Sequence, residues 1–544
     1  MRRMRSITPP SLLFSLFLLG ALSFPACGSD NATGGGGDGG ADDGTSGADG
    51  GGGGDGGGGG DGGGGGDGGG GPDVGASVVQ HHNHANRDGV FVDAKLGKAS
   101  LATLHLDTSF VATVQGPTYA QPLFVDGALG GKDALIVATE QNIVYAFDAA
   151  TGATVWKTPV LAAPVPKSKL PCGNIDPLGV TGTPYLDLGA RTLYLSAMTT
   201  PDGGTTKRHK IYALSLDDGS VRAGWPVDVQ AAVPSFTSDV QNQRGAVLVQ
   251  DGILYVPYGG HYGDCGNYHG WLVGVDVATP TNVKSWATPA ARGGAWCAAG
   301  VSTDGTSMYV TTGNTSGAGA NAWGGGDAVI RLAKGPVFSN AAADYFAPQN
   351  WLALDNADLD MGTHALVNAP GITPSSLVLG FGKDGNVYML DHASLGGIGK
   401  QLATVKGGDG ELTGAITTYT TPAGTFVSFR VDGGTICPSG QGGNTTTMKL
   451  VAGSPPTMKV VWCSKENLAL PVTSMTTAAG GDAIVWNMSN DRLYAYDAET
   501  GAELFAGGGA GDTMASGIGY FQTPIVAKGR VFVPANDRLY AFTP

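Results

Sequence analysis

An acidic stretch in the second half of the chain has the residue types of a calcium loop. Asn356, Asp358 and Asp360 stand at alternate positions, and side-chain oxygens at this spacing open an EF-hand loop. An EF-hand also needs a glycine at the sixth position and a glutamate at the twelfth, but Gly362 stands one place late and no glutamate closes the loop. We therefore interpret the stretch as an acidic turn, with a cation site as the alternative.

A run of histidines offers a second kind of metal chemistry. His81, His82 and His84 place three imidazoles within four residues, and imidazole suits zinc, copper or nickel. The run opens the folded domain directly after a glycine-rich tract, so we expect these side chains to be solvated or to serve packing. The sequence has no His-Glu-x-x-His, Gly-x-Ser-x-Gly or P-loop pattern, and hydrolase and nucleotide chemistry therefore have no support.

A recurring phrase predicts the elements that must position such residues. Residues 144–152 read Val-Tyr-Ala-Phe-Asp-Ala-Ala-Thr-Gly, and residues 493–501 read Leu-Tyr-Ala-Tyr-Asp-Ala-Glu-Thr-Gly. Each copy is a strand that turns on Asp-x-x-Thr-Gly, and degenerate copies lie between them. Such repetition is typical of a radial β-array in which each unit buries its face only against its neighbours. A propeller is a scaffold, so this fold leaves the function open.

Eight such units account for residues 79–544. No convincing long amphipathic helix interrupts them, and Gly and Asp turns punctuate β-branched or aromatic runs throughout. The units lie near residues 119–156, 182–219, 253–276, 308–332, 377–391, 425–462, 483–501 and 522–542. The predicted fold class is therefore an all-β, eight-bladed β-propeller of four-stranded blades.

The last unit stops at the chain end before its fourth strand. An open sheet edge leaves backbone donors and acceptors unpaired, so another segment must supply the missing strand. Residues 110–114, which read Phe-Val-Ala-Thr-Val, precede the first unit and can do so. We therefore expect N- and C-terminal segments to close the ring together.

The first 27 residues resemble a bacterial lipoprotein signal peptide. Basic residues at positions 2, 3 and 5 precede an apolar stretch over residues 12–22, which is too short to span a bilayer. The stretch is followed by Ala26 and Cys27, and a small residue before a cysteine resembles a lipobox, in which the cysteine becomes the diacylated first residue. We expect lipidation at Cys27; ordinary cleavage that leaves a free thiol is the alternative.

Residues 28–78 predict a disordered Gly/Asp-rich linker. Glycine dominates residues 28–73, which contain no Lys or Arg, so this tract has too little to bury to offset its ordering entropy. A Gly-rich linker of roughly 45 residues has an rms reach of about 35–40 Å. The chain carries a net charge of −14, but the linker and signal peptide account for much of it and leave the domain at −8. No basic stripe favours nucleic acid.

The amino-acid sequence of the units resembles the pyrroloquinoline-quinone (PQQ) type repeat. The first unit reads Ala-x-Asp-x-x-Thr-Gly-x-x-x-Trp up to Trp156, and the resemblance covers most of residues 80–544. This repeat is found in quinoprotein dehydrogenases and in the propeller lipoprotein of the outer-membrane barrel-assembly machinery. Segments between the repeats, such as Tyr-Ala-Gln-Pro-Leu at residues 119–123, look like a branch of secreted bacterial propellers. The resemblance implies the fold, and its Trp docks one blade on the next.

The resemblance also implies where a quinone and a cation would lie. In methanol-dehydrogenase-like enzymes a Trp lies under the cofactor, and a Thr-Gly-Asn turn gives an amide oxygen to Ca²⁺; Trp296 and Asn314 are similar in order and spacing. A flat aromatic ring suits an ortho-quinone, and a hard oxygen suits the cation. Where these enzymes supply a glutamate ligand, Asp264 could substitute. The alternative is that Trp296 packs within a blade and Asn314 belongs to a tight turn.

Other parts of the enzyme pattern are missing. The chain has no adjacent cysteine pair, which these enzymes place against the other face of the quinone. Their catalytic Asp lies in a loop whose nearest counterpart contains Asn350, and an amide cannot accept the substrate proton. Asp355, Asp358 and Asp360 are possible stand-ins. We therefore expect no cofactor and no dehydrogenase activity, with PQQ and Ca²⁺ as the alternative.

The cysteines fit an exported protein. Apart from Cys27 the chain has five, so two disulfides and one spare thiol are the ceiling. Cys437 and Cys463 lie in the same unit, which makes a local bridge plausible. Cys265 could pair with Cys297 or with Cys172. A bridge to Cys297 would fix the segment beside Trp296 as a structural staple.

We therefore predict an exported, lipid-anchored propeller that acts as a non-catalytic binding or assembly scaffold in the bacterial envelope, at the outer membrane or cell surface. A periplasmic or secreted soluble location is the alternative. Two other functions stay open: a PQQ- and Ca²⁺-dependent alcohol or sugar oxidoreductase, and a glycan- or solute-binding surface protein. We expect a monomer that meets the membrane only through its N-terminal lipid and has envelope proteins or a small ligand as partners.

Overall fold

The computed structural model describes residues 76–544, except residues 317–321, 434–435, 466–473, 479–481 and 520. The expected signal peptide, Cys27 and nearly all of the expected linker lie outside the described residues. Val78 already pairs with Phe124 of the first blade, so contacts with the propeller begin just before residue 79. No helix in the described residues is long and apolar enough to cross a membrane.

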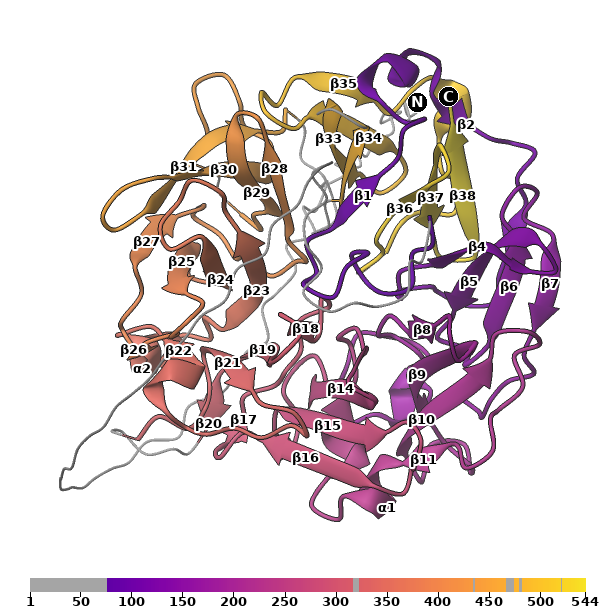
Figure 1. The fold of residues 1–544 in the computed structure, drawn as a ribbon. Helices are drawn as coiled ribbons and strands as arrows, with labels where there is room; N and C mark the ends of the chain where they lie inside the picture. The colour runs from indigo at the N-terminus through magenta and orange to yellow at the C-terminus, as the bar shows by residue number, and fades with distance from the viewer. Residues whose placement is uncertain (1–75, 317–321, 434–435, 466–473, 479–481, 520) are drawn as a thin grey trace, which may run out of the picture.

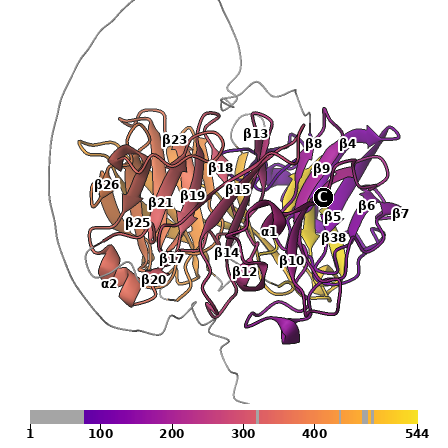
Figure 2. The ribbon, with the colours of Figure 1, turned by 90° about the horizontal axis from the view of Figure 1, so that it is seen from below.

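Eight β-sheets stand around a common centre as the blades of a propeller (Figure 1). In the first blade, β4 lies nearest the centre and β7 lies at the rim (Figure 1). The molecule seen from its side has two faces, with β17, β20 and α2 at one and β8, β18 and β23 at the other (Figure 2). The predicted all-β, eight-bladed fold is confirmed.

The first four blades follow one another along the chain. The first contains β4 (Leu123–Leu129), β5 (Lys132–Ala138), β6 (Val144–Asp148) and β7 (Thr154–Lys157). The second contains β8 (Tyr185–Asp187), β9 (Thr192–Thr199), β10 (Arg208–Ser215) and β11 (Val227–Asp228). The third contains β12 (Gln241–Asn242), β13 (Leu248–Gln250), β14 (Ile253–Gly260), β15 (Trp271–Asp276) and β16 (Val283–Ala287). The fourth contains β18 (Ser302–Thr303), β19 (Met308–Thr312), β21 (Ala328–Leu332), β22 (Tyr345–Ala347) and a parallel addition, β26 (Gly397–Ile398).

The other four blades complete the ring. The fifth contains β23 (Met361–Asn368), β24 (Ser376–Gly382), β25 (Asn386–Asp391) and β27 (Ala403–Lys406). The sixth contains β28 (Thr417–Thr421), β29 (Gly424–Arg430), β30 (Thr445–Val451) and β31 (Thr457–Cys463). The seventh contains β32 (Ser474–Ala478), β33 (Asp482–Met488), β34 (Leu493–Asp497), β35 (Glu503–Ala506) and a parallel inner strand, β1 (Val90–Val92). The eighth contains β36 (Ile525–Ala527), β37 (Arg530–Pro534), β38 (Arg538–Thr543), β2 (His105–Leu106) and β3 (Ala112–Thr113).

The remaining elements are short. Two strands, β17 (Ala291–Arg292) and β20 (Thr315–Ser316), pair with each other outside the blades. The helices are α1 (Val229–Ala232), α2 (Trp351–Asn356), η1 (Lys98–Thr103), η2 (Lys167–Lys169), η3 (Ser238–Val240), η4 (Ala342–Asp344) and η5 (Ala510–Asp512).

The ring closes in the eighth blade with strands from both ends of the described chain. Ala112 and Thr113 of β3 pair antiparallel with Leu539 and Arg538 of β38, which confirms the strand expected within residues 110–114. The second closing strand, β2, also pairs with β38 and was not predicted. Both N-terminal strands cover an edge that would otherwise expose unpaired backbone groups.

The recurring phrase is explained by the turn that it forms and by the contact between neighbouring blades. The Asp148 carboxylate accepts hydrogen bonds from the backbone N–H groups of Ala150 and Thr151, at 3.0 and 3.1 Å. This Asx turn lets the chain reverse, and Gly152 takes a φ of +77° that other residues rarely adopt. Trp156 then donates from Nε1 to the backbone oxygen of Leu216 in the second blade, at 3.0 Å.

The second copy of the recurring phrase, at residues 493–501, contacts the tryptophan of the preceding blade. Trp462 of the sixth blade donates from Nε1 to the backbone oxygen of Ala498 in the seventh, at 3.0 Å. Its indole lies so close to Gly501 that a Cβ there would come within 2.7 Å of the ring. Gly501 thus has two roles: its backbone adopts a positive φ of +71°, and its lack of a side chain lets the preceding blade dock.

Residues 78–92, which we call the plug, cross the centre of the ring (Figure 1). The Arg87 guanidinium donates to the backbone oxygens of Val247 in the third blade and of Val301 just before the fourth, at 3.0 and 2.9 Å. Further backbone contacts of the plug reach Leu186 of the second blade and Thr418 of the sixth. The plug therefore connects blades that lie far apart along the chain, such as the second and the sixth.

The histidine run belongs to this plug and packs within it. The rings of His81 and His82 are buried and stacked, with centroids 4.5 Å apart. Burial lowers the pKa of His82 to about 4, so the ring is neutral at ordinary pH. His84 forms a hydrogen bond with Asp88 instead, at 2.8 Å. Of the two roles expected for the run, His81 and His82 thus serve packing.

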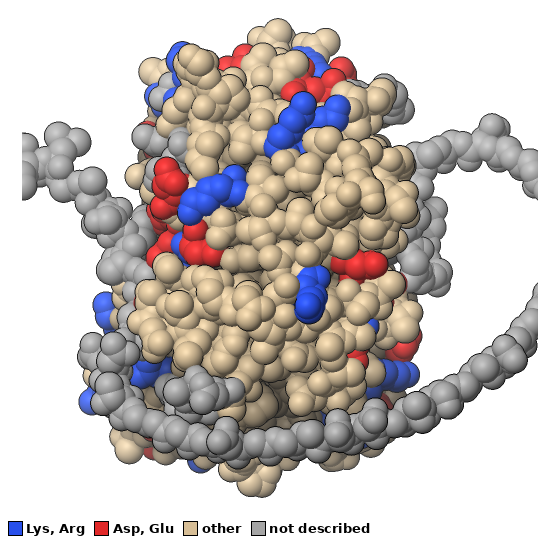
Figure 3. All heavy atoms as spheres, turned by 90° about the vertical axis from the view of Figure 1, so that its left-hand side faces the viewer, with Lys and Arg blue, Asp and Glu red and all other residues tan. Residues whose placement is uncertain are grey.

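Charges are sparse on the side of the molecule shown in Figure 3. Lys, Arg, Asp and Glu side chains of both signs are interspersed there among a larger number of uncharged residues. This side accordingly offers no broad surface of a single charge.

Candidate functional site

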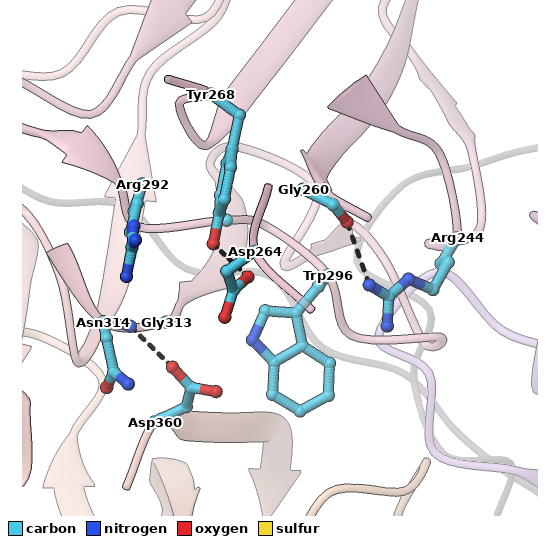
Figure 4. A pocket seen from close by; sticks show the side chains of 10 residues that line it. Arg244, Gly260, Asp264, Tyr268, Arg292, Trp296, Gly313, Asn314 and Asp360 are labelled. Carbon is cyan, nitrogen blue, oxygen red and sulfur yellow. Dashed lines mark hydrogen bonds between the residues drawn. The ribbon is translucent and has the colours of Figure 1, made fainter. Parts of the chain in front are cut away.

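One pocket brings together the three residues for which the sequence suggested a quinone or a cation. Trp296, Asn314 and Asp264 all line a small hollow that is partly open to solvent (Figure 4). We call it the Trp296 pocket, and its other lining residues are Arg244, Gly260, Tyr268, Arg292, Gly294, Gly313 and Asp360. The pocket lies where segments of the third, fourth and fifth blades meet.

Glycines allow the walls of the pocket to approach each other. A Cβ on Gly313 would lie 2.5 Å from Asp360 Oδ1 and 2.8 Å from Trp296 Nε1. A Cβ on Gly260 would lie 2.4 Å from the Tyr268 ring. Backbone hydrogen bonds fix the loops at this distance, among them one from the N–H of Gly313 to the oxygen of Gly294 at 3.0 Å. Larger side chains at these positions would fill the pocket.

The acidic stretch packs against the Asn314 turn. Asp360 Oδ1 accepts a hydrogen bond from the backbone N–H of Asn314, and Asp358 Oδ1 accepts one from its Nδ2, both at 2.6 Å. Asp355 Oδ1 accepts from the backbone N–H of Thr315, at 2.7 Å. The side-chain oxygen of Asn314 is buried and has no hydrogen-bond partner among the described residues. Of the stretch interpreted as an acidic turn, Asp360 therefore lines the pocket, and Asp358 packs beside it against Asn314.

Burial and mutual repulsion make these carboxyl groups weak acids. Burial raises the pKa of Asp355 to about 6, and it raises the pKa of Asp358 to about 7 although Lys383 opposes the shift. Burial first and the charge of Asp360 second raise the pKa of Asp327 as well. Burial likewise raises the pKa of Asp264, against the effect of its hydrogen bond from Tyr268. The site therefore gains stability from a proton or another positive charge.

Lys383 supplies one positive charge and was not found from the sequence. Its Nζ lies 2.5 Å from Asp360 Oδ2 and 3.8 Å from Asp358 Oδ1, and 5.5 Å from the centroid of the Trp296 ring. A signal for it existed, because Met361 of β23 pairs with Gly382 of β24. Pairing of those two strands places the residues just outside them, Asp360 and Lys383, side by side.

The loop that carries Asp264 is held by a disulfide. Cys265 is bonded to Cys172, with their Cα atoms 6.0 Å apart, which is one of the two pairings left open by the sequence. The other, Cys265 with Cys297, is wrong, because Cys297 is a buried free thiol whose Sγ donates to Thr363 Oγ1 at 3.0 Å. Asp264 itself accepts a hydrogen bond from the Tyr268 hydroxyl at 2.6 Å.

The two other cysteines form the expected local bridge. Cys437 and Cys463 are bonded, with their Cα atoms 5.7 Å apart. The ceiling of two disulfides and one spare thiol is reached among the described cysteines. Asn350, the counterpart of a catalytic aspartate, is exposed before α2 and does not line the Trp296 pocket.

Comparisons with known proteins identify the fold. No model of a known protein family matches, and no curated protein matches. The quinohemoprotein alcohol dehydrogenase of Comamonas testosteroni has 15% identity and a TM-score of 0.58 over 87% of this chain and 81% of that chain. A europium-containing methanol dehydrogenase has 14% identity and a TM-score of 0.56 over 86% of this chain and 98% of that chain.

A third structure, BamB from Moraxella catarrhalis, has 13% identity and a TM-score of 0.46 over 80% of this chain and 99% of that chain. This likeness is too weak to carry an argument. The two dehydrogenases show that the chain shares the PQQ-like propeller fold expected from its repeat. At such identities the likeness concerns the fold alone.

Proposed function

We propose that the protein is an exported, non-catalytic binding propeller whose Trp296 pocket takes a hard metal ion. The observation that supports this most is the Asn314 amide oxygen, which is buried and without a described hydrogen-bond partner beside Asp358 and Asp360. Amide and carboxylate oxygens are the ligands that Ca²⁺ prefers. The same donors suit a lanthanide, and one protein of this fold is a europium-containing methanol dehydrogenase.

An incoming ion would have to compete with Lys383. Within the described residues, no three His, Cys, Asp or Glu side chains already form a metal-binding group, and Asp360 is paired with the Lys383 ammonium. The ion would replace that ammonium as the counter-charge of Asp360 and would draw on Asn314, Asp358 and Asp264 for further oxygens. Burial raises the pKa of Asp358 although Lys383 opposes the shift, so a cation beside it would stabilise the carboxylate form.

Terbium luminescence tests this proposal, because Trp296 can transfer absorbed energy to a Tb³⁺ ion held beside it. We expect saturable emission from one site, displaced by Ca²⁺, and about tenfold weaker binding in Asp360→Asn. Asp537→Asn, at an exposed carboxylate of the eighth blade, is the matched control and should bind as the parent does. Emission that never saturates, or that is unchanged in Asp360→Asn, would show that the pocket holds no such ion.

A quinone-dependent oxidoreductase is the second candidate, because Trp296 lines the pocket. A ring stacked between the indole and the Lys383 ammonium would need about 7 Å, since each contact takes roughly 3.5 Å, but that gap is 5.5 Å. As the side chains lie, this face of Trp296 does not fit a planar quinone. The test is a titration with PQQ and Ca²⁺; stoichiometric binding lost in Trp296→Ala, with dye reduction by an alcohol or sugar, would favour the oxidoreductase.

The location is proposed from the N-terminus and the cysteines. We infer export and lipidation at Cys27, and the two disulfides are of the kind that persist in oxidising compartments. In a Gram-negative host, labelled palmitate should enter the parent protein and not Cys27→Ser, which should leave the membrane fraction. Equal labelling of both proteins would contradict the lipid anchor.

A further inference from the structure

The Cys172–Cys265 disulfide joins two loops beside the Trp296 pocket. Cys172 lies in the connection between β7 of the first blade and β8 of the second, and Cys265 lies in the loop between β14 and β15 of the third. Cys265 directly follows Asp264, which lines the pocket. The bridge therefore restrains the position of an oxygen donor that we expect to meet the metal ion.

Hydrogen bonds fix the two ends of the Asp264 loop, residues 261–268, more than its middle. At one end His261 Nε2 lies 3.1 Å from a backbone oxygen of η3, and at the other the oxygen of Tyr268 accepts a hydrogen bond from β17 at 2.6 Å. Between these ends, the described backbone of residues 263–266 has one hydrogen bond, from Asp264 N–H to the oxygen of His261 at 3.0 Å. The bridge therefore supplies a covalent restraint where hydrogen bonds are few.

The backbone conformation of the loop also depends on its surroundings. Asp264 has a φ of +49°, in the left-handed region, and the nearby Gly263 and Gly266 have φ values of +97° and +83°. A non-glycine residue seldom adopts such a φ unless its surroundings impose it. A Cβ on Gly263 would lie 3.4 Å from both Cβ and Sγ of Cys172, so the bridge packs against this segment. We expect the segment to relax when the bridge opens.

The two disulfides differ in how readily a thiol can open them. Cys172 and Cys265 are both half-buried residues of loops. In the other bridge, Cys463 belongs to β31 and is only 1% exposed. A thiolate that attacks Cys437 must expel Cys463 as a thiolate into this buried position, and burial disfavours the charged form. Thiol exchange should therefore open the Cys172–Cys265 bridge first.

We propose that the Cys172–Cys265 disulfide is a redox switch that sets the affinity of the Trp296 pocket for its metal ion. A dithiol reductant attacks one sulfur of the bridge, which breaks the S–S bond, forms a mixed disulfide and releases the other cysteine as a thiolate. The second thiol of the reductant displaces the remaining cysteine, and the reductant leaves as a disulfide, so two electrons and two protons pass to Cys172 and Cys265. Asp264 is then no longer held in place for the ion, which binds more weakly. This inference rests on the proposed function, because it concerns regulation of that same site.

Metal binding and the redox state of the bridge must affect each other equally. If the oxidised protein binds the ion about tenfold more tightly than the reduced protein, a saturating ion lowers the reduction potential of the bridge by about 30 mV, which is the equivalent for a two-electron couple. A disulfide that is not coupled to the ion would show no such shift. The potential therefore distinguishes a switch from a purely structural bridge.

Controlled reduction tests the order of opening and its effect on the site. The mature protein is treated with limiting dithiothreitol, its free thiols are alkylated, and peptide mapping by mass spectrometry identifies the opened bridge. We expect Cys172 and Cys265 to be alkylated before Cys437 and Cys463, and the desalted product to bind Tb³⁺ about tenfold more weakly than the oxidised parent. Opening of Cys437–Cys463 first, or equal Tb³⁺ affinity of the oxidised and alkylated proteins, would overturn the inference.

Paired serine variants separate the loss of the bridge from the bulk of the alkyl groups. Cys172→Ser combined with Cys265→Ser should weaken Tb³⁺ binding by about tenfold. Cys437→Ser combined with Cys463→Ser removes the other bridge, is the matched control and should bind as the parent does. Equal weakening in the two double variants would assign the effect to the fold as a whole and would also overturn the inference.

A redox titration of the parent protein measures the coupling directly. In dithiothreitol buffers of stepped potential, saturating Ca²⁺ should lower the reduction potential of Cys172–Cys265 by about 30 mV, and an unchanged potential would contradict the switch. Absence of Tb³⁺ binding by the oxidised parent would overturn the proposed function and this inference with it. Tb³⁺ binding that does not depend on the bridge would overturn this inference alone.

Discussion

Lys383 determines how much negative charge in the Trp296 pocket is left for a metal ion. Its ammonium is buried beside Asp360 and near Asp358, and a buried ion pair leaves a costly unpaired charge when one partner is removed. Whether the remaining negative charge can accept an ion in place of the ammonium distinguishes a binding site from a structural ion pair.

Lys383→Met should therefore raise the affinity for Tb³⁺ by about tenfold, because the competing ammonium is gone. The metal-free variant should melt lower than the parent, and saturating Ca²⁺ should restore most of the loss. Luminescence titration and calorimetric melting give the two quantities. Lys334→Met, at an exposed lysine near Asp251, is the control that should change neither, and weaker Tb³⁺ binding by Lys383→Met would indicate a purely structural pair.

Metal binding should also depend on pH. The pKa of Asp355 is raised to about 6 and that of Asp358 to about 7, so both groups release protons between pH 5 and 8 and can then hold a cation. We expect the affinity for Ca²⁺ to rise across this interval, about tenfold or more. Asp358→Asn should flatten the upper part of the profile, and an affinity that is constant from pH 5 to 8 in the parent would contradict the assignment.

At the scale of the element, the glycine of the turn allows the chain to reverse and also allows the preceding blade to dock. Gly501→Ala should destabilise the protein more than Gly252→Ala, although both have a φ above +70°. A methyl group at Gly252 meets no atom within 4 Å, whereas at Gly501 it would lie 2.7 Å from Trp462. We expect about 1–2 kcal/mol from the backbone in each case and about 1–3 kcal/mol more from the clash. Denaturant melts measure both, and equal losses would show that the Trp462 contact adds nothing.

The elements also show what the sequence could and could not predict. Strands bounded by Asp-x-x-Thr-Gly were predictable because each unit carries its own turn and its own docking tryptophan. The closing strand at residues 112–113 followed from the need to cover an open edge. β1, β2 and the plug did not, because their pairing partners lie hundreds of residues away and no local pattern marks them.

The candidate site was predictable only in part for the same reason. Trp296 and Asn314 lie close together in sequence and match a known order, so they were found. Arg244, Arg292 and Lys383 come from three separate segments, and only the ring geometry brings them to one pocket. Pairing Cys265 with Cys172 likewise depends on how the second and third blades meet, which the spacing of the cysteines does not determine.

At the scale of the whole molecule, buried neutral histidines should make the fold sensitive to acid. Burial lowers the pKa of His82, His209 and His364 to about 4, from 6.5 in the unfolded chain. The unfolded state therefore binds more protons below pH 6.5, and this contribution to stability is lost as the pH falls toward 4. We expect these histidines to lower the melting temperature between pH 7 and pH 5, against the carboxyl groups of Asp355 and Asp358, whose raised pKa values favour the protonated folded state in the same interval.

Glutamine variants identify the source of that loss. His82→Gln should lose less stability between pH 7 and pH 5 than the parent does, because an amide does not titrate. His105→Gln, at an exposed histidine of β2, is the control and should keep the parent's profile. Identical pH profiles for the parent and His82→Gln would assign the acid sensitivity to other groups.

The plug determines how the molecule would bear a mechanical load. A pull on the segment before residue 76 reaches the plug before it reaches β2 and β3. Arg87 and the surrounding backbone hydrogen bonds lie across several blades, so they would share the force in shear. The force would then not act directly on β2 and β3, whose hydrogen bonds to β38 would otherwise break one after another. A tethered protein could therefore bear a pull at its N-terminus without opening its eighth blade.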